Sequence, residues 1–163
     1  MSDRPTTPPT DSQATPDVLI VGAGPAGLAL AIALAQAGLR STVLEQAPLA
    51  SLADPPEDGR DIALTHRGRA VLQALGAWDR IEPGEVAPLC RAEVRDGLSP
   101  LVLPFDGKAQ GHDALGWLVP NHRIRAAVHA TAALQSGVTL QGDARVVAFD
   151  SDEQGASVTL QDG

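Results

Sequence analysis

Six residues near the start of the sequence have the composition of a loop that binds phosphate groups. The pattern G-x-G-x-x-G is matched by Gly22, Ala23, Gly24, Pro25, Ala26 and Gly27. In such a loop the first glycine permits a tight turn, the second lets backbone approach a pyrophosphate, and the third lets a helix pack on a sheet. Glu45 follows 18 residues after Gly27, where a carboxylate accepts hydrogen bonds from ribose hydroxyls. The spacing therefore predicts nucleotide binding rather than a purely structural turn.

The residues around this loop predict the elements that position it. Residues 17–21 form a short apolar run typical of a buried strand, and residues 26–36 are rich in the helix formers Ala and Leu. Residues 41–45 predict a second strand, which gives a βαβ unit with parallel strands. We expect a solvated loop over residues 47–60, in which the acidic Asp54, Glu57 and Asp58 are exposed rather than bound to a metal.

The remaining sequence predicts a second helix, a small antiparallel layer and a third helix. Thr65 is expected to cap a helix that ends at Leu75 and buries Val71, Leu72 and Leu75. The antiparallel layer would contain residues 91–95, 101–105 and 115–119, with a turn at Asp96-Gly97. Residues 124–134 predict a further helix, followed by short strands at residues 138–140, 144–149 and 156–160. Together these elements predict an α/β fold with a Rossmann-like βαβ unit.

Composition excludes several classes of protein. The 163 residues include 12 Lys or Arg and 20 Asp or Glu, a net charge of −8, which argues against binding to nucleic-acid phosphates. The single cysteine, Cys90, excludes an internal disulfide and is expected only to pack. The four histidines show no metal-ligand spacing, so no metal site is predicted. Trp78 and Trp117 are expected to pack, because aromatic residues are scarce.

The two ends of the sequence carry their own expectations. Residues 1–16 are rich in Thr and Pro and fit neither a secretion nor an import signal. We therefore expect a disordered leader at residues 1–16, a domain over residues 17–163 and a cytoplasmic location. The final Asp162-Gly163 is typical of a hairpin turn whose returning strand is missing. This pattern predicts that the chain is a fragment, incomplete at its C-terminus.

Two further segments resemble a known family. Residues 59–78, GRDIALTHRGRAVLQALGAW, and residues 115–125, LGWLVPNHRIR, are similar to the FAD-dependent aromatic hydroxylases of ubiquinone biosynthesis. These belong to the group A flavoprotein monooxygenases, which include 4-hydroxybenzoate hydroxylase, and the similarity is greatest to the 5-demethoxyubiquinol hydroxylase branch. The resemblance implies a 4-hydroxybenzoate-hydroxylase-like fold, FAD as cofactor, NAD(P)H as reductant, and O2 and a prenylated quinol as substrates. It also leaves room for peripheral contact with the inner membrane or for a ubiquinone-biosynthesis assembly.

The resemblance also implies roles for particular residues. It places Arg60 beside the flavin and the pyrophosphate, Ala63 close to the ring system and His66 on a helix near the flavin. Asn121 matches a position that contacts the cofactor and is often Gln or Arg in the family, and Arg125 lies one turn later. Gln46, next to Glu45, is included in the predicted cofactor site. The alternative for both Arg60 and Arg125 is an ordinary surface arginine that does not contact the cofactor.

Two other classes of function stay open at this point. One is a different FAD- or NAD-dependent oxidoreductase, such as a dehydrogenase or reductase, and the other is a non-catalytic nucleotide-binding remnant. No catalytic residue is identified, because in the resembled family the cofactor performs the difficult chemistry. As an N-terminal part of such a hydroxylase, the chain alone would bind the ADP half of FAD weakly and would not turn over.

Overall fold

A parallel sheet and the helix that crosses it form the first half of the fold. The structure, a computed structural model, describes residues 15–97 and 99–161; most of the predicted leader, residues 1–14, lies outside them. Strands β1 (Val18–Val21), β2 (Ser41–Leu44) and β8 (Val138–Gln141) pair in parallel in the order β1-β2-β8. Helix α1 (Pro25–Gln36) connects β1 to β2, which confirms the predicted βαβ unit.

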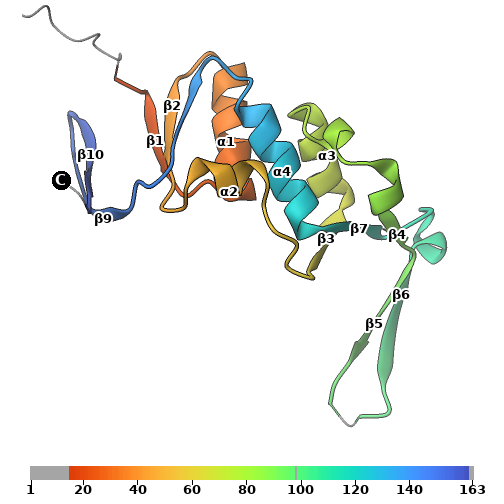
Figure 1. The fold of residues 1–163 in the computed structure, drawn as a ribbon. Coiled ribbons are helices and arrows are strands. Elements are labelled where there is room, and N and C mark those ends of the chain that lie inside the picture. Colours follow the sequence, from red (N-terminus) through yellow and green to blue (C-terminus); the bar gives the residue numbers. More distant parts are fainter. Residues whose placement is uncertain (1–14, 98, 162–163) are drawn as a thin grey trace, which may run out of the picture.

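A second, antiparallel sheet is separated from the first by helices (Figure 1). Its strands are β3 (Asp61–Thr65), β7 (Gly116–Pro120) and β4 (Ala87–Leu89), in the order β3-β7-β4. Helix α3 (His66–Ala74) follows β3 directly, and the Thr65 hydroxyl accepts a hydrogen bond from the Gly68 N–H at 3.1 Å. The predicted cap is therefore confirmed. Helix α4 (Asn121–Ala132) follows β7 and packs against α1, which joins the two sheets.

Two hairpins complete the fold. Strands β5 (Arg91–Arg95) and β6 (Val102–Asp106) form one that projects from the rest of the chain, and β9 (Val146–Asp152) and β10 (Gly155–Leu160) form the other (Figure 1). Short helices occupy four further ranges: α2 (Leu49–Ala53), η1 (Trp78–Arg80), η2 (Pro83–Glu85) and η3 (Lys108–Gln110).

The antiparallel layer differs from its prediction. Residues 115–119 were expected to pair with the hairpin of residues 91–105, but β7 pairs with β3, a strand that the sequence did not reveal, and with β4. The reason is burial. Val119 of β7 is fully buried and needs partners in the core, whereas every residue of β6 is exposed.

Five smaller predictions were also wrong. The loop expected at residues 47–60 contains α2, because Leu52 is buried in the core. Helix α4 begins at Asn121 rather than residue 124, and the strand expected from residue 144 begins at Val146. Val71 is 46% exposed, so only Leu72 of α3 and the following residue, Leu75, are buried as predicted. Cys90 is exposed instead of packed.

The core gathers where α1, α4 and the two sheets meet. Its largest fully buried side chains are aliphatic and belong to Leu28, Ile32, Val43, Val119 and Val128. Trp78 and Trp117 pack against this core while staying partly exposed. Among residues 15–97 and 99–161, no helix is long and apolar enough to cross a bilayer.

A substitution at Gly27 tests how closely α1 packs on the turn that follows β1. A Cβ added there would lie 2.1 Å from the Gly22 carbonyl oxygen, so Gly27→Ala forces the helix away from the turn. We expect Gly27→Ala to lower the free energy of unfolding by about 1–3 kcal/mol, as overpacking does. Gly24→Ser, where the added atoms meet open space, should leave stability unchanged or slightly higher because serine is a good N-cap. Urea unfolding measures both, and equal stability of the two variants would contradict the packing.

Candidate functional site

The glycine loop between β1 and α1 is held by backbone contacts. Gly22 has φ +100°, a conformation that favours glycine, and its N–H donates to the Leu44 carbonyl oxygen at 2.7 Å. Gly27 is required because any side chain at this position would collide with the Gly22 carbonyl oxygen. The turn thus accounts for two of the three glycines in the motif.

The middle glycine has no such structural reason. Gly24 has φ −71° and ψ 174°, which any residue adopts, and an added Cβ would meet no protein atom within 4 Å. Nothing in the described residues therefore prevents a side chain at this position. Glycine here leaves open space directly beside the backbone, which suits the close approach of a ligand.

The start of α1 offers hydrogen-bond donors to that space. Gly24 is the N-cap residue without a side-chain cap, Pro25 occupies the first turn, and no acidic residue is present there. Among the described residues, the N–H groups of Ala26 and Gly27 have no hydrogen-bond partner. Because free N–H groups and the positive end of the helix dipole favour anions, this helix end suits a phosphate.

Glu45 lies just after β2 and is tied to the loop. One carboxylate oxygen accepts a hydrogen bond from the Ala23 N–H at 2.8 Å, and the other accepts from the Ala47 N–H at 3.0 Å. These bonds fix the carboxylate beside the glycine loop, and each oxygen keeps a free lone pair for a ribose hydroxyl. The motif predicted the residue but not its bonds to the backbone.

A cavity of about 370 Å³ adjoins these residues. It lies where β1 and β2 end and is lined by Val21, Gly22, Leu44, Glu45, Gln46, Ala144, Arg145 and Val146. The carboxyl ends of parallel strands are the usual place for a nucleotide in such folds. Arg145 is a lining residue that sequence reasoning missed, since no motif distinguishes it from other exposed arginines.

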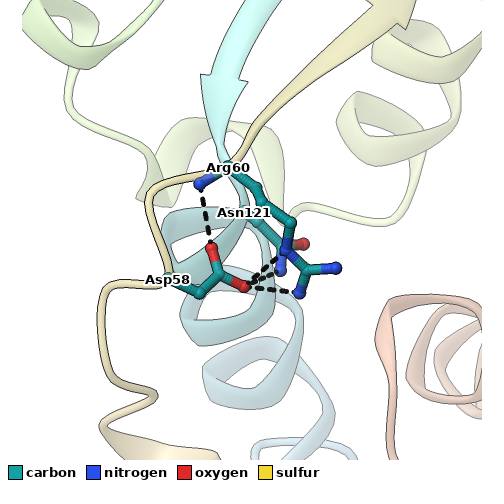
Figure 2. A network of polar contacts seen from close by, with 3 residues as sticks. All are labelled: Asp58, Arg60 and Asn121. Carbon is teal, nitrogen blue, oxygen red and sulfur yellow. Dashed lines mark hydrogen bonds and ion pairs between the residues drawn. The ribbon is translucent and has the colours of Figure 1, made fainter.

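A second group of predicted residues meets around Asp58 (Figure 2). One Asp58 oxygen accepts hydrogen bonds from the Arg60 guanidinium, at 2.9 Å from Nε and 2.5 Å from Nη2, and from the Asn121 side-chain amide at 2.7 Å. The other accepts from the Arg60 N–H at 3.2 Å. The Asn121 N–H also donates to the Arg60 carbonyl oxygen, at 2.8 Å. Asp58 thus holds together two candidate residues that are far apart in the sequence.

Asp58 is exposed, as predicted for the acidic loop, but its carboxylate is hydrogen-bonded in a way that the prediction did not foresee. Its side chain is 25% exposed, whereas that of Arg60 is 68% exposed. The hydrogen bonds from Arg60 and then from Asn121 hold the pKa of the Asp58 carboxyl well below its usual range, and the same pairing raises the pKa of Arg60. The sequence feature that could have indicated this pairing is the D-G-R string, in which Asp58 stands two residues before Arg60.

The other predicted residues lie outside this network. Ala63 is exposed on β3, opposite Leu118, and the half-buried Arg125 forms no hydrogen bond among the described residues. The His66 ring nitrogen Nε2 donates to the Ala114 carbonyl oxygen at 2.8 Å, and the ring packs against Trp117. Within the part of the chain that the structure describes, no group of three metal-ligating side chains is found.

Comparison with known proteins places the chain among FAD-binding proteins. Residues 15–163 match the family described as FAD binding domain. Ubiquinone hydroxylase UbiM of Neisseria meningitidis is 41% identical over 151 residues, which cover 90% of this chain and 33% of that protein. The 3-demethoxyubiquinol 3-hydroxylase of Escherichia coli is 30% identical over 148 residues, which cover 90% of this chain and 38% of that protein. The chain therefore spans about a third of the length of the curated relatives that it matches.

The solved structures agree on the fold. The crystal structure of pqsL, a probable FAD-dependent monooxygenase from Pseudomonas aeruginosa, is similar with a TM-score of 0.64 and 27% identity. The match covers 91% of this chain and 39% of that one. The predicted fold class and the resemblance to flavin-dependent hydroxylases are thus confirmed.

The Asp58 network predicts a specific pH dependence of stability. Because the pKa of Asp58 is lowered on folding, its contribution is complete above the unfolded pKa of about 3.9 and is lost as pH falls toward the folded value. Asp58→Asn should therefore be less stable than the unaltered chain by a constant amount between about pH 5 and 8, with the difference shrinking below about pH 4. Urea unfolding at a series of pH values measures this.

The neighbouring Glu57 supplies the control. Glu57 is exposed and forms no hydrogen bond or ion pair among the described residues, so Glu57→Gln should leave stability unchanged at every pH. A difference for Asp58→Asn that persists undiminished at about pH 2 would contradict the network.

Proposed function

The chain belongs to the FAD-binding-domain family, and from this premise we propose that it forms the N-terminal FAD-binding part of a monooxygenase. The complete enzyme would use NAD(P)H and O2 to hydroxylate a prenylated benzoquinol ring in ubiquinone biosynthesis. The observation that carries the proposal is Gly24, where the fold leaves room for a side chain and a pyrophosphate bound beside the backbone would not. Two relatives, ubiquinone hydroxylase UbiM and 3-demethoxyubiquinol 3-hydroxylase, support the substrate class by their names.

The glycine loop would hold the ADP half of FAD. The N–H groups of Ala26 and Gly27 would bind the pyrophosphate beside Gly24. Pro25 has no N–H, but the N–H at the first position of a helix has no partner within the helix, so Pro25 fixes the first turn without loss of a helical hydrogen bond. The Glu45 carboxylate would accept hydrogen bonds from the adenosine ribose, with Gln46 at the edge of the same cavity. The negative charge of Glu45 disfavours a 2′-phosphate at this place.

Arg60 and Asn121 would serve the other half of the cofactor. A guanidinium binds phosphate oxygens through two donors at once, and Asp58 restricts the rotation of Arg60 so that less entropy is lost on binding. Ala63, which has only a methyl group on an exposed strand face, leaves room for a flat ring, and Arg125 one turn into α4 could add a second positive charge.

Bound FAD would supply electron transfer from NAD(P)H and the activation of O2. The described residues contribute binding and orientation: the α1 N-terminus and Glu45 hold the phosphates and ribose, and the Asp58 network holds Arg60. They provide no acid–base pair for the transferred oxygen, which agrees with chemistry that is carried by the cofactor.

We further propose a cytoplasmic location with peripheral contact to the inner membrane. The support is the projecting hairpin β5–β6, where Val94, Leu101 and Leu103 are 58%, 78% and 58% exposed. Exposed apolar side chains gathered on one projection favour contact with an apolar partner. A membrane surface would also be the source of a prenylated quinol.

A substitution at Gly24 tests the cofactor site. The Cβ of Gly24→Val would meet no protein atom within 4 Å other than its chain neighbours, and the side chain would occupy the space beside the helix N-terminus, so we expect a folded chain with no measurable FAD binding. Gly84→Val is the matched control, because Gly84 also has open surroundings but lies in η2, away from the loop. Calorimetric titration with FAD measures both, and equal FAD affinity of the Gly24→Val variant and the unaltered chain would refute the site.

A chimera tests the reaction. Residues 15–163 replace the matching segment of Neisseria meningitidis UbiM, and the product is assayed for FAD content, O2 uptake and incorporation of one oxygen atom into a prenylated quinol. We expect quinol-dependent O2 uptake, lost in the same chimera carrying Gly24→Val. Oxidation of NAD(P)H without quinol hydroxylation would favour a different oxidoreductase, and a folded chimera without FAD would favour a non-catalytic remnant.

A further inference from the structure

A second cavity, of about 510 Å³, lies apart from the candidate cofactor site. It is bounded by the segment from η1 to β4 together with Arg69 of α3 and Trp117 of β7. In the β3–β7 pairing Trp117 is opposite Leu64, whereas Ala63 is opposite Leu118. Because neighbouring side chains on a strand point to opposite faces, this cavity lies on the face of the sheet away from Ala63. It shares no lining residue with the cavity at Glu45.

Both tryptophans of the chain form walls of this cavity. The ring centroids of Trp78 and Trp117 are 6.4 Å apart, with the planes inclined at 69°. His66 packs edge-on against Trp117 with centroids 4.8 Å apart, and its bond to the Ala114 carbonyl oxygen holds it there. The remaining lining is mainly apolar and includes Ile81 and Val86. These walls suit a flat ring.

One positive charge is held against both tryptophans. The guanidinium carbon of Arg69 lies 4.8 Å from the Trp78 ring centre and 4.3 Å from that of Trp117. Cation–π contacts of this kind orient the guanidinium but accept none of its hydrogen bonds.

The charge of Arg69 has no counter-ion in the described part of the chain. It forms neither a hydrogen bond nor an ion pair there, and its Nε atom is buried without a partner. Asp79 lines the same cavity but is not within ion-pair distance. Five of the described arginines pair with carboxylates, and Arg67, Arg80, Arg125 and Arg145 do not. Among these unpaired arginines of the described residues, Arg69 is distinguished by its buried side-chain nitrogen without a partner. Shielding a charged donor from water without an acceptor is unfavourable, so the site favours an incoming anion.

From these observations we propose that the cavity between α3, η1 and β7 binds a small aromatic carboxylate. Its volume falls in the range typical of small-molecule sites, which combine apolar walls with a few polar groups. The ring of the ligand would lie against Trp78, Trp117 and the aliphatic residues, and its carboxylate would pair with Arg69. This site is additional to the proposed function and does not depend on FAD binding.

The scarcity of aromatic residues makes the test specific. The chain has two tryptophans and no tyrosine, so labelling with 5-fluorotryptophan gives two fluorine NMR signals, both from this cavity. The chain is titrated with 2-naphthoate and, separately, with the uncharged 2-naphthylmethanol. We expect both signals to shift along one saturating curve with 2-naphthoate, which should bind at least about tenfold more tightly than the alcohol because of its charged hydrogen bonds.

Two variants on α3 identify the residue responsible. Arg69→Met keeps most of the side-chain volume and should weaken 2-naphthoate binding by about tenfold or more while leaving binding of the alcohol nearly unchanged. Arg67→Met is the matched control on the same helix, since Arg67 is exposed and does not line the cavity, and it should bind like the unaltered chain.

Three results would overturn the proposal: unshifted signals, equal affinity for the acid and the alcohol, or undiminished binding by Arg69→Met. If Arg69→Met does not fold, the comparison of acid and alcohol on the unaltered chain still decides. FAD binding by that same chain is measured separately, so failure here leaves the proposed cofactor site standing.

Discussion

The turn between β1 and α1 brings two backbone segments so close that no side chain fits between them. Gly27 rests on the Gly22 carbonyl group, and Gly22 in turn bonds to the end of β2. This contact sets the position of α1 over the parallel sheet. The buried face of α1 packs against α4, and α4 contacts β7 of the second sheet. The contact at Gly27 also points the free N–H groups of the first turn toward open space. The same close approach thus determines both the packing of the core and the place of the phosphate site.

The second sheet supplies what the glycine loop lacks, a positively charged group with a fixed orientation. Pairing of β3 with β7 places the start of α4 next to the loop before β3, so that Asn121 and Arg60 meet at Asp58. The Asp58 carboxylate neutralises part of the Arg60 charge but restricts its rotation. Two structural devices therefore serve one proposed cofactor: a helix terminus for the ADP half and a tethered arginine for the other half.

Sequence reasoning succeeded where the determining interactions are local. The βαβ unit follows from a glycine motif and two apolar runs, and the α3 cap follows from Thr65 and the next three residues. It failed where distant segments decide the structure. Nothing near residues 115–119 indicates that their partners are β3 and β4, and nothing in residues 47–60 shows that Leu52 is buried or that Asp58 meets Asn121. The cavity around Arg69 joins three elements in the same way, so its two tryptophans were predicted only to pack.

In the proposed cofactor site, the start of α1 and Glu45 would bind the ADP half of a dinucleotide. Titration of the ¹⁵N-labelled chain with ADP, followed by amide NMR, tests this proposal most directly because each backbone N–H reports separately. Saturable shifts are expected at residues 22–24, 26 and 27 and at Glu45 and Gln46, largest for the unpartnered N–H groups of Ala26 and Gly27. Shifts confined to other parts of the chain, or none at saturating ADP, would contradict it.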